Sequence, residues 1–188
     1  GSSVVGAVFN PILLTLSLEN VEYFKNGTGA PHIVNAQFQD LFATFGGAGS
    51  TLSLLIAMLI VCRSKRIKEL GKLALVPGIF GINEPIIFGM PIVYNPFLAL
   101  PFFLAPMASA SLAYFAIKFE IVKPMLAQMP WPSPIGIGAF IGSGGDWNAA
   151  VLAVLCAILA FAIWFPFIKF YDNKLLKEEQ DKAKELAA

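Results

Sequence analysis

Charge is scarce in this chain of 188 residues. Only 13% of the residues are Asp, Glu, Lys or Arg, about half of the ~25% that is usual in soluble domains. The net charge of +1 gives no basic surface for a polyanion, which argues against nucleic-acid binding. The two cysteines, Cys62 and Cys156, lie in apolar runs and cannot form a disulfide framework. With 57% hydrophobic residues, these shortages argue against a soluble enzyme, a disordered segment or a coiled coil, and indicate an integral membrane protein.

The spacing of the charges predicts where the chain crosses a membrane. Residues 41–62 carry no charge, residues 73–117 carry only Glu84, and residues 124–168 carry only Asp146. A spanning helix needs about 20 apolar residues. Three spans are therefore predicted, over about residues 47–62, 98–117 and 149–168.

The N-terminal stretch and the C-terminal tail complete the predicted organisation. Residues 1–18 are uncharged and are either the end of another span or part of a re-entrant element. The Asn10-Pro11 pair makes a plain helix there less favourable. The prediction is an all-α membrane domain over residues 1–170, with about three to five transmembrane helices plus re-entrant hairpins. Residues 171–188 form a charged, solvated helix, with a docking arm as the alternative.

Basic residues predict the orientation. Ten of the thirteen Lys and Arg residues lie in segments 63–72 and 169–184, which the positive-inside rule places in the cytoplasm. The C-terminus is then cytoplasmic. Residues 73–97 must then enter and leave the membrane on the cytoplasmic side. Residues 129–147 must begin and end on the other side.

Three segments are broken by proline and glycine. Residues 73–97 contain four prolines, and an apolar segment broken so often is tolerated only where it packs in protein or lines a cavity. A re-entrant hairpin with its tip near residues 81–85 fits both the composition and the predicted orientation, in which the segment begins and ends on the cytoplasmic side. Residues 130–147 and 31–49 have the same character, and such segments point to a transporter's binding site.

Glu84 is the strongest candidate for chemistry. A carboxylate in an apolar stretch faces a cavity or a partner, and it is suited to accept a proton. The alternative is a structural carboxylate that caps the hairpin or pairs with a distant lysine. The neighbouring Asn83 can both donate and accept hydrogen bonds, as sugar recognition requires. Its alternative is a turn residue that satisfies its own backbone.

Other polar and aromatic residues are candidates for substrate binding. His32, the only histidine, follows a proline in a predicted turn, and Asn35 and Gln37 alternate after it. Trp131, held between two prolines, offers a stacking platform for a sugar ring, or else an interfacial anchor. Trp147 and Trp164 resemble interfacial and lipid-facing residues.

No self-contained catalytic site is evident. A lone histidine is no metal site, and the sequence indicates no cofactor. The glycine-rich run at residues 46–51 lacks the lysine of a phosphate loop and fits close helix packing better. Asp146 fits a cap for the helix that starts near Asn148.

The sequence resembles a known family at residues 81–96. There a Gly-Ile-Asn-Glu-Pro core is followed by Gly-x-Pro-Ile-Val-x-Asn-Pro. This signature resembles enzyme IIC, the membrane permease of the bacterial sugar phosphotransferase system, in its lactose, cellobiose and diacetylchitobiose branch. Supporting matches are Asn-Pro at 10–11, Pro-His-Ile-Val at 31–34, Gly-Gly-x-Gly-x-Thr-Leu at 46–52, Pro-Trp-x-x-Pro at 130–134 and Gly-Gly-Asp-Trp at 144–147.

The resemblance implies a role for the chain. It matches the C-terminal, sugar-binding half of such a permease in the bacterial plasma membrane, and a sugar-site histidine of the family would precede Gly1. The missing N-terminal half would form the homodimer, and transport would follow an elevator mechanism. Glu84 would contact the 6-hydroxyl of a β-linked disaccharide or β-glucoside, while Asn83 and Trp131 hold the sugar. A phosphocysteine on cytosolic enzyme IIB, itself supplied by enzyme IIA, would be the phosphoryl donor.

Two other classes of protein stay open at this point. A proton-coupled secondary sugar transporter would use Glu84 as its proton site and would need no phosphoryl donor. An intramembrane enzyme or a structural subunit is the third reading, although an enzyme would usually need a second catalytic residue near Glu84, and none is evident.

Overall fold

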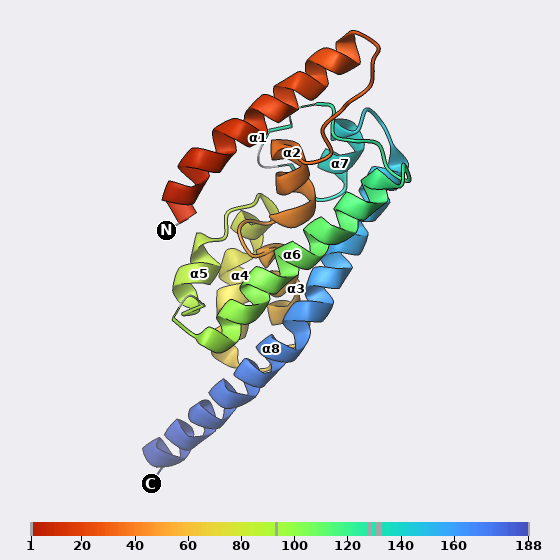
Figure 1. Ribbon diagram of the computed structural model, residues 1–188. Coiled ribbons are helices and arrows are strands. Elements are labelled where there is room, and N and C mark those ends of the chain that lie inside the picture. Colours follow the sequence, from red (N-terminus) through yellow and green to blue (C-terminus); the bar gives the residue numbers. More distant parts are fainter. Residues whose placement is uncertain (1, 93, 128, 131–132, 188) are drawn as a thin grey trace.

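The computed structural model describes residues 2–92, 94–127, 129–130 and 133–187, and these residues form helices without a β-strand (Figure 1). This confirms the predicted all-α class. The elements are α1 (Ser2–Lys25), α2 (Ala36–Phe38), the π-helix η1 (Gln39–Ala43), α3 (Thr51–Ile60), α4 (Lys65–Ile79), α5 (Glu84–Gly89), α6 (Pro96–Lys118), α7 (Ile137–Gly142) and α8 (Trp147–Ala187).

Helices α6 and α8 are long and run side by side (Figure 1). Both are long and apolar enough to cross a membrane, which agrees with the predicted second and third spans. Small side chains let the two backbones approach closely, and the Ser109 hydroxyl of α6 donates a hydrogen bond to the Cys156 carbonyl of α8 at 3.2 Å. The buried small residues of this interface are Ala105, Ser109 and Ala113 on α6 and Ala153, Cys156 and Ala160 on α8.

The predicted first span, over residues 47–62, is wrong in its length. Helix α3 has ten residues and is about 15 Å long, half of the ~30 Å hydrocarbon layer. The helix cannot begin earlier because Gly47, Gly49 and Ser50 have positive φ angles of 102°, 83° and 53°, which a right-handed helix excludes. Among the described residues, only α6 and α8 therefore qualify as candidate spans.

The N-terminal stretch also differs from its prediction. Helix α1 continues through Pro11 for 24 residues, whereas the Asn-Pro pair argued against a plain helix. A proline removes only its own N–H donor, so one carbonyl four residues earlier loses its helical partner while the other helical hydrogen bonds can remain. Prolines also lie inside α4, α6 and α8, so the effect is general in this chain.

The segments broken by proline and glycine fold into short helices and turns. Helix α4 ends at Ile79 and α5 begins at Glu84, which places the turn of the hairpin at residues 80–83 and confirms its predicted tip. Entry of this hairpin into a membrane stays a prediction. Residues 36–43 form the short elements α2 and η1, and residues 137–142 form α7. Asp146 accepts a hydrogen bond from the Asn148 backbone at 2.9 Å, which confirms its predicted capping role.

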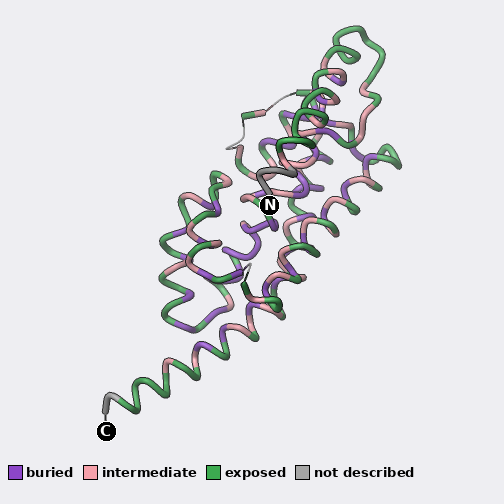
Figure 2. Tube along the Cα trace, turned by 60° about the vertical axis from the view of Figure 1, so that its left-hand side comes forward, coloured by how far each residue is buried: buried purple, intermediate pink, exposed green. Residues whose placement is uncertain are grey.

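Helix α8 continues without a break from the core into the charged tail. Figure 2 shows that its free end is mostly exposed. Trp164, expected to face lipid, is instead fully buried, and its indole nitrogen donates to the Gly49 carbonyl at 3.0 Å. The division of the chain at residue 170 stays a prediction, and one face of the tail is buried where Asp172 and Leu175 lie.

Candidate functional site

The hairpin tip (residues 80–84) packs against the glycine loop (residues 46–50). The Asn83 side chain is buried, and its Nδ2 donates to the Ala48 carbonyl at 3.0 Å. A Cβ atom on Gly47 would lie 2.5 Å from the Asn83 Cγ, so only glycine permits this approach. Asn83 therefore satisfies the backbone of another loop, whereas the sequence offered sugar binding or its own turn as alternatives. A role for Asn83 in sugar binding stays a prediction.

Glu84 lies at the start of α5 with its side chain exposed. Within the described part of the chain, no hydrogen bond or ion pair is made by its carboxylate. A free carboxylate next to an anchored turn keeps its acceptor oxygens available. The structure thus leaves the Glu84 oxygens open to a hydrogen-bond donor, while Asn83 beside it is held in place.

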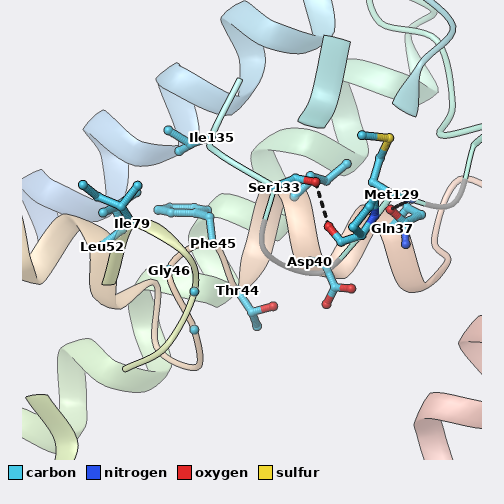
Figure 3. Close-up of a pocket in the computed structure, with 14 residues that line it drawn as sticks. Gln37, Asp40, Thr44, Phe45, Gly46, Leu52, Ile79, Met129, Ser133 and Ile135 are labelled. Carbon is cyan, nitrogen blue, oxygen red and sulfur yellow. Dashed lines mark hydrogen bonds between the residues drawn. The ribbon is translucent and has the colours of Figure 1, made fainter. Parts of the chain in front are cut away.

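A pocket lies next to the tip, where the three broken segments meet (Figure 3). Polar side chains reach it from α2 and η1 and from the segment before α7. The Gln37 Oε1 accepts a hydrogen bond from the Met129 backbone at 2.9 Å, and the Ser133 hydroxyl donates to the Pro130 carbonyl at 2.7 Å. The other lining residues are Asp40, Leu41, Thr44, Phe45, Gly46, Gly47, Leu52, Ile79, Gly81 and Ile135.

Asp40 is a charged lining residue of the pocket that was not among the site residues predicted from the sequence. It lies on η1, outside the two candidate spans, and its carboxylate is drawn with Thr44 in Figure 3. Burial raises the pKa of the Asp40 carboxyl because desolvation disfavours the charged form. The signal that could have found it is its position as the last charge before residues 41–62.

His32 and Asn35 lie outside this pocket. Asn35 caps α2 by accepting from the Phe38 backbone at 2.9 Å, and its Nδ2 donates to the Met125 carbonyl at 3.3 Å. The His32 ring nitrogen Nε2 lies 2.6 Å from a carboxylate oxygen of Glu19. Both side chains therefore contact other parts of the protein, and a sugar-binding role for either stays a prediction.

Of the predicted binding residues, the structure brings three to one area. Gln37 lines the pocket, and Asn83 and Glu84 form the end of the tip whose Gly81 also lines it. Trp131 lies outside the described residues. In the described ranges, no group of three or more His, Cys, Asp or Glu side chains is close enough to hold a metal ion.

Two long apolar helices and a pocket built from segments broken by proline and glycine are features expected of a membrane transporter. The model of the family described as "Phosphotransferase system, EIIC" matches residues 1–106. The chain is 42% identical over 183 residues to the PTS system cellobiose-specific EIIC component of Geobacillus stearothermophilus, covering 96% of this chain and 41% of that protein. The chain therefore belongs to the EIIC family of the phosphotransferase system, whose members are membrane permeases.

Further relatives support the assignment. The Lichenan permease IIC component of Bacillus subtilis (strain 168) is 40% identical over 182 residues, which cover 96% of this chain and 40% of that protein. The crystal structure of the transporter ChbC, the IIC component of the N,N'-diacetylchitobiose-specific phosphotransferase system, superposes with a TM-score of 0.91 at 40% identity. The superposition covers 95% of this chain and 42% of ChbC. The chain spans less than half the length of these relatives.

Proposed function

We propose that the chain is the sugar-binding part of an EIIC permease that carries a β-linked disaccharide or β-glucoside across the bacterial plasma membrane. The observation that carries the proposal is the Glu84 carboxylate, which is exposed and has no hydrogen-bond partner among the described residues, at the end of an anchored hairpin beside a pocket that contains polar side chains. The printed names of relatives support the substrate class, since they include cellobiose, lichenan and lactose.

The proposed reaction uses Glu84 as a general base. The sugar lies over the pocket, which admits single hydroxyl groups and not a whole ring, with Gln37, Asp40 and Ser133 as hydrogen-bonding groups and Trp131 as a stacking surface. Its 6-hydroxyl faces Glu84, which takes the hydroxyl proton as the oxygen attacks phosphorus. The phosphorus–sulfur bond of the phosphocysteine on enzyme IIB breaks, the phosphorus–oxygen bond forms, and the cysteine leaves as a thiolate. This chain then supplies orientation and a proton acceptor, and enzyme IIB supplies the phosphoryl group.

Partners and geometry follow from the same proposal. The PTS system lactose-specific EIICB component of Lacticaseibacillus casei, 39% identical over 182 residues, has a name that joins the C and B components, which supports enzyme IIB as the partner. Enzyme IIA would act upstream of it. We place the C-terminus in the cytoplasm, assign transport to an elevator movement, and assign the homodimer contact to a scaffold outside these residues.

The test follows the fate of the sugar in membrane vesicles. The full-length gene product that contains this chain is placed in vesicles with radiolabelled cellobiose. One set receives phosphoenolpyruvate and the soluble phosphotransferase components, and the other receives only a proton gradient. The proposal predicts sugar phosphate in the first set alone. Unmodified sugar accumulating in the second set would instead support proton-coupled transport and contradict the proposal.

The substrate is identified by direct binding. Isothermal titration calorimetry of the same protein against cellobiose, lactose, diacetylchitobiose and an aryl β-glucoside should give a binding signal for at least one of them. Maltose, an α-linked disaccharide, is the matched control. Tighter binding of maltose than of every β-linked sugar would contradict the proposed substrate class.

A further inference from the structure

The corner between α3 and α4 is held by the C-terminal part of α8. Helix α3 ends at Ile60 and α4 begins at Lys65, so carbonyls at the end of α3 and N–H groups in the first turn of α4 lack helical partners. The chain turns sharply here, and side chains of α8 reach these groups from far along the sequence.

Asp172 supplies the first contact. Its carboxylate is fully buried and accepts hydrogen bonds from the Arg63 backbone at 3.0 Å and from the Ser64 backbone at 2.9 Å. Burial of an unpaired carboxylate is costly, and these backbone donors compensate for it. Asp172 therefore fixes the residues that lead into α4.

Glu179 supplies the second contact, two helical turns further along α8. Its Oε1 accepts from the Ser64 hydroxyl at 2.6 Å and from the Arg66 backbone at 3.3 Å, and its Oε2 accepts from the Lys65 backbone at 3.4 Å. Ser64 is itself the N-cap of α4. A carboxylate at this end of a helix also interacts favourably with the helix dipole.

Lys169 supplies a contact of opposite sign to the preceding helix. Its ammonium group donates to the Val61 carbonyl at 3.4 Å, at the C-terminal end of α3. One face of α8 thus gives a cation to a helix C-terminus and two carboxylates to a helix N-terminus, each where the dipole favours it. Ile168 and Leu175 are buried on the same side.

We infer that Asp172 and Glu179 are positioning residues for the reaction at Glu84, and we name Lys169, Asp172 and Glu179 the α8 latch. Helix α4 runs from the latched corner to the hairpin tip, and it packs on α3 and α5. A change at its first turn moves the tip, and a misplacement of about 1 Å at a reacting group can lower a rate about 100-fold. This inference rests on the proposed function, and it assigns the charged tail a part in positioning Glu84.

The test combines a distance and a rate in the full-length gene product. Spin labels on Phe88→Cys of α5 and Met107→Cys of α6 report the position of the hairpin, because both sites are exposed and the native Cys62 and Cys156 are buried. Glu179→Ala should shift or broaden the label distance. It should also lower kcat for sugar phosphorylation at least about tenfold while KM changes less than about threefold.

Two variants separate positioning from general damage. Glu179→Gln keeps an acceptor oxygen and should recover part of both the distance and kcat. Glu178→Ala, on the neighbouring exposed residue, should change neither. A Glu179→Ala protein in which either the label distance or kcat keeps its wild-type value would overturn the inference. Failure of the proposed function is seen separately, as absence of sugar phosphorylation in the wild type, and the label distance still tests the latch in that case.

Discussion

Two polar regions of this chain use similar side chains in opposite ways. In the Asn20 junction, formed by Asn20, His32, Asn35 and Met125, every side-chain amide is buried and bonded. Asn20 donates to the carbonyls of His32 at 2.8 Å and Met125 at 3.2 Å, and accepts from the His32 backbone at 2.9 Å. At the hairpin tip, Asn83 makes one such bond while Glu84 is left exposed.

The difference distinguishes side chains that stabilise the fold from side chains that stay open to a ligand. A buried amide with all of its partners inside the protein stabilises one arrangement of segments, and it has no capacity left for a ligand. A carboxylate without a partner among the described residues contributes little to the fold, and its acceptor oxygens stay open to a ligand. Both kinds of residue look alike in the sequence, where each is a polar residue in an apolar segment.

The largest effect is expected for Glu84→Gln, which removes the proton acceptor and keeps the shape. Sugar phosphorylation by enzyme IIB should fall roughly 100- to 10,000-fold, the usual contribution of a general base. Sugar affinity, measured by calorimetry, should change only a few-fold. Glu69→Gln, an exposed residue on α4 of the same hairpin, is the control. Near-normal phosphorylation in Glu84→Gln would show that this carboxylate is not the base.

The next largest effect is expected for Asn20→Ala, which removes the central side chain of the buried Asn20 junction. The change removes the side-chain partner of the His32 backbone N–H and carbonyl and leaves the Met125 carbonyl with Asn35 as its remaining amide donor. It should cost about 2–4 kcal/mol of unfolding free energy. Denaturant unfolding in detergent measures it, with Asn26→Ala in an exposed turn as the control. Equal stability of the two variants would mean that the junction contributes nothing specific.

Gly47→Ala tests how the tip is anchored. The added methyl group meets Asn83 and forces a positive φ on alanine, so a loss of about 1–3 kcal/mol is expected. Gly29→Ala has a similar φ with nothing within 4 Å, so the excess over this control measures the clash. The double variant Gly47→Ala, Asn83→Ala should lose less than the sum of the single changes, and strict additivity would argue against the contact.

The smallest effect is expected for Glu19→Gln. Its partner His32 is 32% exposed and Glu19 is 44% exposed, and such pairs contribute at most about 1 kcal/mol. Thermal unfolding should therefore change little, and sugar phosphorylation should keep its wild-type rate. A large loss of phosphorylation would show that His32 takes part in the reaction and does not only stabilise the fold.

The sequence predicts the elements that depend on local composition. The long apolar stretches of α6 and α8, the turn at residues 80–83 and the Asp146 cap agree with it, because apolar length, proline spacing and capping chemistry act within a few residues. The glycine loop shortens α3 through backbone conformation that a hydropathy count does not contain. Pro11 is accommodated because the rest of the α1 hydrogen-bond ladder is kept.

The candidate site is predictable only in part. Glu84 stands out because it is alone in residues 73–117, and Gln37 lies in a segment whose composition marks it. Asn20 and Asp172 act through partners more than ten residues away, and such long-range partners cannot be read from one sequence. Trp164 was misplaced for the same reason, since its hydrogen bond to the glycine loop joins residues 115 positions apart.

Helix α8 has a mechanical consequence. Its 41 residues extend over about 62 Å, roughly twice the ~30 Å of membrane hydrocarbon. A tilt of α8 as one body is therefore enlarged at its far end. A rotation of about 10° around one end of a rod of this length carries the other end through about 10 Å. A reporter placed near Lys184 would display, on an enlarged scale, small changes of tilt that occur deep in the membrane.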